Sequence, residues 1–106
     1  MIALKLNPPN TADSVAKWLT KHIRNDKAPT WTVVTLNDGT EAFTHNAKQY
    51  YGKGFISLPE VKSKDIIGFT YIPGEDELEN GYTGRFVEML LNHVPTKSIK
   101  VVSVVP

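Results

Sequence analysis

The sequence contains no cysteine among its 106 residues. Disulfides, thiolate metal sites and cysteine nucleophiles are therefore excluded, which agrees with a reducing compartment. No stretch reaches the roughly 18 consecutive apolar residues that a membrane-spanning helix needs, and the first ten residues show no basic leader followed by an apolar run. We therefore expect a soluble, cytoplasmic protein.

The length predicts a single domain spanning residues 1–106, which can bury a modest core without a metal or a disulfide. The hydrophobic share of 41% and the charged share of 22% are those of a folded chain rather than a disordered one. The net charge of +1 hides a polarity, because basic residues gather in the first 30 positions and acidic ones between positions 65 and 82. This asymmetry is compatible with an anionic partner and equally with head-to-tail self-association.

The first part of the chain has the pattern of a strand followed by a helix. Apolar and polar residues alternate over residues 2–6, which is typical of a strand with one buried face. Over residues 12–25 the apolar side chains Val15, Trp18, Leu19 and Ile23 share one helical stripe, which we expect to pack on the sheet. Either Thr11 or Asp13 is a suitable N-cap for this helix.

The central part of the chain has the pattern of an antiparallel meander. We expect strands over residues 30–36, 40–45, 55–58 and 66–72. The pair Asp38-Gly39 is a strong hairpin signal, because it supplies positive backbone φ at little cost. A two-residue loop would place Val34 opposite Phe43, whereas a three-residue loop would shift that register.

A second helix is expected from an N-cap at Thr83 to about His93, and a last strand over residues 97–105. Five of the seven residues from 99 to 105 are apolar, so we expect this strand in a paired, largely covered position rather than at a bare edge. The order β-α-β-β-β-β-α-β predicts the α+β class, as a two-layer sandwich with a mixed, mostly antiparallel sheet and two helices on one face.

The most ligand-like composition lies after the third strand, at residues 50–54. Two tyrosines, two glycines and a lysine combine stacking surface, a flexible backbone and a positive charge, although the spacing of a phosphate loop is absent. We expect these residues to join an exposed sheet face in a surface for a small anionic or planar ligand or a protein partner. The predicted binding residues are Trp31, His45, Tyr50, Tyr51 and Lys53. The leading hypothesis is a non-enzymatic binding or interaction module that forms a homodimer.

Two alternatives remain open from the sequence. The basic side chains Lys17, Lys21 and Arg24 of the first helix, with tyrosine stacking, would suit a nucleic-acid-binding domain whose affinity falls steeply with salt. The weak net charge counts against this alternative. The second alternative is a small enzyme with His45 as its acid–base group, because the ordinary pKa of histidine lies close to physiological pH.

Neither a metal nor a cofactor is expected. The three histidines are widely separated and lack metal-ligand spacing such as HExxH. The acidic residues between positions 75 and 79 lack the spacing of a calcium loop. No serine lies in a nucleophile elbow, so hydrolase chemistry has no support in the sequence.

Overall fold

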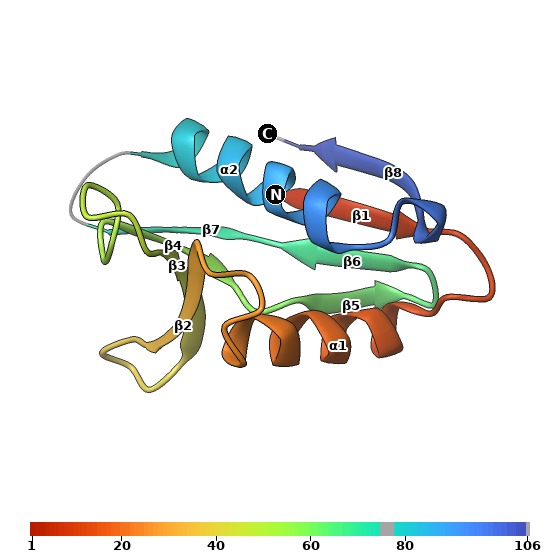
Figure 1. The fold of residues 1–106 in the computed structure, drawn as a ribbon, viewed down its shortest axis with the longest axis horizontal. Helices are drawn as coiled ribbons and strands as arrows, with labels where there is room; N and C mark the ends of the chain where they lie inside the picture. The colour runs from red at the N-terminus through yellow and green to blue at the C-terminus, as the bar shows by residue number, and fades with distance from the viewer. Residues whose placement is uncertain (75–77, 106) are drawn as a thin grey trace.

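The computed structural model describes residues 1–74 and 78–105 and confirms the α+β class (Figure 1). Within these residues the elements are, in chain order, β1 (Ile2–Leu6), α1 (Ala12–Arg24), β2 (Trp31–Thr35), β3 (Glu41–His45), β4 (Gly54–Ser57), β5 (Glu60–Ser63), β6 (Ile66–Phe69), β7 (Tyr71–Pro73), α2 (Glu79–His93), a short 3-10 helix (Thr96–Ser98) and β8 (Ile99–Val104). Most of the predicted acidic run, at 75–77, lies outside the described residues. No helix of the described chain is long and apolar enough to cross a membrane.

The strands form two four-stranded antiparallel sheets rather than the single mixed sheet that was expected. Sheet A has the order β5-β6-β1-β8, and sheet B has the order β2-β3-β4-β7. The expected strand over residues 66–72 is interrupted at Thr70, and its two halves, β6 and β7, belong to different sheets. The run from β4 to β5 changes sheet in the same way at Pro59, which cannot donate a ladder hydrogen bond. The N–H of Ser57 donates to the carbonyl of Thr70 at this junction (2.8 Å).

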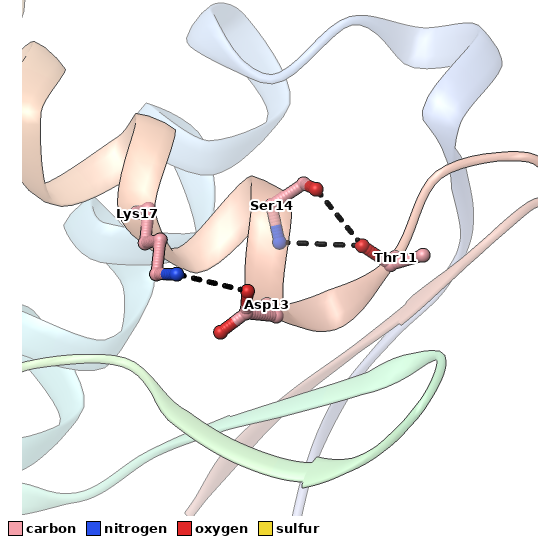
Figure 2. Close-up of polar contacts among 4 residues, drawn as sticks. All are labelled: Thr11, Asp13, Ser14 and Lys17. Atoms are coloured by element: carbon pink, nitrogen blue, oxygen red, sulfur yellow. Dashed lines mark hydrogen bonds and ion pairs between the residues drawn. The ribbon is translucent and has the colours of Figure 1, made fainter.

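Helix α1 begins where the sequence predicts, with Thr11 as its N-cap. The hydroxyl oxygen of Thr11 accepts a hydrogen bond from the backbone N–H of Ser14 at 3.3 Å, and Figure 2 shows this cap beside the ion pair of Lys17 and Asp13. The helix contacts β2, β5 and β6. Its buried residues are Ala12, Ala16, Leu19 and Ile23. Trp18, which was expected on the buried stripe, is 40% exposed and stacks on His22 instead.

The β2–β3 hairpin has the three-residue loop, which places Val33 rather than Val34 opposite Phe43. The N–H of Leu36 donates to the carbonyl of Thr40 at 2.7 Å, so Asn37, Asp38 and Gly39 form the loop. Gly39 has φ +87°, a conformation that glycine adopts far more readily than other residues. The turn chemistry of the sequence is therefore confirmed, with the longer of the two loops.

The N-cap of helix α2 is Leu78, five residues before the predicted Thr83, so that Thr83 lies inside the helix. Leu78 takes the N-cap position without a side-chain hydrogen bond. The apolar stripe that packs this helix against β4 and β7 starts at Tyr82, and its buried residues are Tyr82, Phe86, Met89 and Leu90. The earlier start places Tyr82 on the buried face of the helix, although no side chain caps the first turn.

Both helices share one buried core with β1. The side chains of Ile2, Leu4 and Leu6 alternate into this core, together with Leu19 of α1 and Phe86 of α2. Strand β8 does not reach the covered position that was expected, because it forms an edge of sheet A. Two of its valines and the residue that follows it are exposed, by 48% for Val101, 58% for Val104 and 44% for Val105, whereas Val102 packs partly buried against the core.

Candidate functional site

The predicted site residues Trp31 and His45 lie directly opposite each other at one end of sheet B. Strand β2 begins at Trp31 and β3 ends at His45, and their rings meet edge to face with centroids 5.2 Å apart. Trp31 was expected on an exposed sheet face, and this expectation is wrong: it is only 1% exposed. The physical reason is α2, whose Tyr82 and Phe86 pack against the indole with centroids 5.8 and 5.1 Å away.

Tyr50 extends this aromatic cluster beyond His45. Its ring lies 5.4 Å from the His45 ring and 5.8 Å from that of Tyr82, both in edge-on geometry. The guanidinium of Arg85 sits over the face of Tyr50, 4.4 Å from the ring centroid. Such a cation–π contact holds the Arg85 head group close to the histidine.

The loop that carries Tyr50 is fixed to the sheet by two buried hydroxyls. Thr44 donates to the carbonyl of Gly54 (3.0 Å) and accepts from the N–H of Gly52 (3.1 Å). Tyr82 donates a short hydrogen bond to the carbonyl of Tyr50. The loop therefore has defined partners at Tyr50 and at Gly52, and the position of Tyr50 is set by α2 as well as by β3.

A hollow of about 740 Å³ opens beside these residues, between the ends of β2 and β3 and the outer face of α2. We call it the Trp31 pocket. Its lining residues are Pro29, Thr30, Trp31, His45, Asn80, Gly81, Gly84, Arg85, Glu88, Met89, Asn92 and His93. Gly84 leaves open space over the helix, since a Cβ added there would meet no atom within 4 Å. Because Gly81 and Gly84 carry no side chain, this face of the helix leaves room for the hollow.

The polar groups of the Trp31 pocket are of both kinds, donors and acceptors. Arg85 supplies a permanent positive charge and Glu88 a carboxylate, with the amides of Asn80 and Asn92 nearby on the same helix face. His93 lies at the far end of the pocket and forms a hydrogen bond between its Nδ1 and the Nε2 of His22 (3.1 Å). The pocket wall is thereby linked to α1.

The surroundings of His45 favour its neutral form and one tautomer of it. Burial and the nearby charge of Arg85 lower the pKa of His45 from its ordinary value. Its Nδ1 accepts a hydrogen bond from the backbone N–H of Ala47 at 3.0 Å, so the proton of the neutral ring sits on Nε2. The imidazole is thus a hydrogen-bond donor toward other groups.

The five predicted binding residues do not form one surface. Trp31 and His45 line the Trp31 pocket, and Tyr50 supports it through Arg85. Tyr51 is 54% exposed and lines a different hollow of about 500 Å³ beside Phe55. Lys53 is half-buried and lies outside both sets of lining residues.

Sequence reasoning missed the contribution of α2. Its pocket-facing residues recur three and four positions apart, at 81, 84, 85, 88 and 92, which is the signature of one helical face. Because the helix was expected to start at Thr83, Gly81 was assigned to a loop. The two glycines on one exposed helix face were the signal that could have revealed the hollow.

The basic face of α1 has two of its three charges paired. Lys17 lies 3.1 Å from Asp13, and Arg24 makes two hydrogen bonds of 2.8 Å to the carboxylate of Glu41. Side-chain hydrogen bonding to Glu41 also raises the pKa of Arg24. With the exposed Lys21, these residues border an apolar hollow of about 490 Å³ that includes Leu58.

Among residues 1–74 and 78–105, no group of three histidine or carboxylate side chains is arranged to hold a metal ion. Comparisons with known protein families, with curated proteins and with solved structures found no match to this chain.

Proposed function

We propose that this chain is a non-enzymatic binding module that takes a small planar ligand with an anionic group in the Trp31 pocket. The observation that carries the proposal is the pocket itself, a hollow of about 740 Å³. His45 and Trp31 line one side of it, and the glycine-lowered face of α2, which also carries Arg85, lines the other. Sites for small ligands in proteins have volumes of about 300–1,000 Å³ and a few convergent polar groups.

The chemistry of the wall selects the ligand class. Arg85 and the Nε2–H of His45 are donors, which suit a carboxylate or a similar planar anion. The nearly buried Trp31 and Met89 form an apolar floor beneath the pocket. Glu88 accepts a hydrogen bond from a donor at the other end of the ligand.

The state of His45 favours binding over acid–base catalysis. A general base needs a free lone pair within reach of the substrate, whereas the Nδ1 lone pair already accepts from Ala47. The remaining ring nitrogen carries the proton of the neutral form. The paired charges of Lys17 and Arg24 likewise reduce the support for a nucleic-acid surface on α1.

Native mass spectrometry of the gently purified protein, followed by a fluorescence titration with benzoate and indole-carboxylate probes, tests the proposal. The substitution Trp18→Phe leaves Trp31 as the only tryptophan, so a change in emission reports on the pocket. Gly84→Leu fills the open space over α2 and should abolish both a co-purified adduct and the emission change. Leu91→Gln, on the same helix outside the pocket lining, is the control and should change neither. Binding that survives Gly84→Leu would refute the proposed site.

A further inference from the structure

Sheet A has two edges of opposite character. At one edge, β5 carries an ion pair between Glu60 and Lys62 (2.8 Å) and a register shift between Val61 and Ser63. Edge charges and irregular register both disfavour the addition of another strand. At the other edge, residues 101–105 carry no charge, and three of their four valines are 44–58% exposed.

The outer edge of β8 presents backbone groups for pairing. Met1 and Val105 exchange two N–H···O bonds, of 2.6 and 2.7 Å, and so form a hydrogen-bonded pair of the antiparallel ladder. Such pairs alternate along a strand, so Ser103 also directs its backbone groups toward β1. The N–H and C=O groups of Val102 and Val104 therefore point away from β1, toward the open side of the sheet.

Residues 101–105 read Val-Val-Ser-Val-Val, which is the same in both directions about Ser103. We infer that β8 is the surface on which a second copy of this chain docks, by antiparallel pairing of residues 101–105 about a two-fold axis at Ser103. In this arrangement Val102 pairs with the partner's Val104, and the outward backbone groups of both copies are satisfied together. Sheet A then continues into a second sheet A.

A contact between two identical strands must be self-complementary, and the palindromic sequence of this edge meets that requirement. A two-fold axis requires each residue to meet its counterpart, and the palindrome places valine against valine and serine against serine. Lys100, the only charged residue of β8, lies at a register shift and outside the paired segment, so the two lysines stay apart. A strand from an unrelated protein would require no such symmetry.

The dimer is expected to be weak and to depend on protein concentration. Five paired residues make a contact smaller than the roughly 1,200–2,000 Å² of a standard interface. The pairing is also independent of ligand binding, because residues 101–105 are not among the described residues that line the Trp31 pocket. Failure of either proposal leaves the other intact.

A single cysteine at the axis tests the inference, since the native chain has none. Ser103 faces its counterpart as a non-hydrogen-bonded pair, with a Cα separation of about 4.5 Å, which lies within the range of about 4.4–6.8 Å for a disulfide. Ser103→Cys should form a covalent dimer under mild oxidation with oxidised glutathione. Ser63→Cys, on the opposite edge, is the matched control and should remain largely monomeric.

A second pair of variants separates strand pairing from random collision. In the Ser103→Cys background, Val104→Lys adds a charge to the docking edge and should lower the rate of cross-linking at least tenfold. Val61→Lys makes the same change at a similarly exposed valine of β5 (50% against 58% for Val104) and should leave the rate unchanged. Circular dichroism checks that both variants are folded. Equal cross-linking of Ser103→Cys and Ser63→Cys, or no effect of Val104→Lys, would overturn the inference.

Discussion

The phenol of Tyr82 in α2 donates a hydrogen bond to the backbone carbonyl of Tyr50, joining the helix to the loop that follows β3. Tyr82 is 1% exposed, so its hydroxyl lies among groups that water does not reach. The same hydroxyl is 3.3 Å from that of Thr44, which binds the end of the loop. One buried side chain thus fixes both the pocket-forming helix and the aromatic ring beneath Arg85.

Tyr82→Phe should lower the free energy of unfolding by about 1–3 kcal/mol, because it leaves the carbonyl of Tyr50 without its donor at nearly constant side-chain volume. Urea denaturation measures the loss, and hydrogen exchange should show faster opening of residues 46–53. Tyr51→Phe removes the hydroxyl of a largely exposed tyrosine and serves as the control. Equal stability of the two variants would contradict the role assigned to Tyr82.

Alanine substitutions at Gly84 and Gly54 should change the free energy of unfolding in opposite directions. Gly84→Ala should raise the free energy of unfolding by about 0.5–1 kcal/mol, since glycine is unfavourable inside a helix and the new Cβ meets no atom within 4 Å. Gly54→Ala should destabilise the protein, because its Cβ would lie 2.8 Å from the hydroxyl of Tyr71 and 3.2 Å from the ring of Tyr82. Thermal unfolding of both variants beside the native protein checks the signs.

Acidification should reduce stability through His22 and His45. Burial is the main cause that lowers the pKa of each; His93 and Lys27 add to it for His22, and Arg85 for His45. Below the ordinary pKa of 6.5 the unfolded chain therefore binds protons that the folded protein excludes. This contribution to stability is complete above pH 6.5 and is lost as the pH falls through the lowered pKa values.

Denaturant midpoints at pH 7.5 and pH 5.0 measure this dependence. The double variant His22→Gln/His45→Asn should show a smaller difference between the two pH values, because Gln and Asn keep an amide at the hydrogen-bonding position without titrating. An unchanged difference would assign the pH dependence to other groups.

Gly39→Ala should destabilise the β2–β3 hairpin by about 1–2 kcal/mol, since an L-residue at φ +87° is strained. Space is not the cause, because nothing lies within 4 Å of the added Cβ. Asp38, whose carboxylate accepts from the N–H of Thr40 at 2.9 Å, should retain that contact in the variant. Asn at position 39 should recover part of the loss, because Asn tolerates this backbone region better than Ala.

Local patterns in the sequence predicted the elements whose causes are local. The cap of α1, the helix itself and the turn at Gly39 depend on residues within a few positions of one another. All three were expected, with Thr11 as one of two cap candidates and the three-residue loop as one of two loop lengths. The break at Pro59 was also visible as the end of a strand. Its consequence, a change of sheet, depends on how the neighbouring strands pair, which no local pattern contains.

The site was less predictable because it depends on contacts between distant residues. The alternation of β2 gives two faces, and only the docking of α2, about fifty residues later, decides that Trp31 is buried. His45 was recognised as a candidate, whereas Arg85 and Gly84 gained significance only once their helix lay beside it. The prediction that β8 is largely covered was also wrong for the single chain, in which β8 is an edge strand.

The difference between the two edges of sheet A limits how far strand pairing can proceed. A sheet with two apolar edges would add copies at both ends and grow into a filament. The Glu60–Lys62 pair and the irregular register make β5 a poor acceptor for a further strand. If two copies join at β8 as proposed, the pairing uses the one edge of the described sheet A that can accept a strand, and assembly through this sheet would end at two chains.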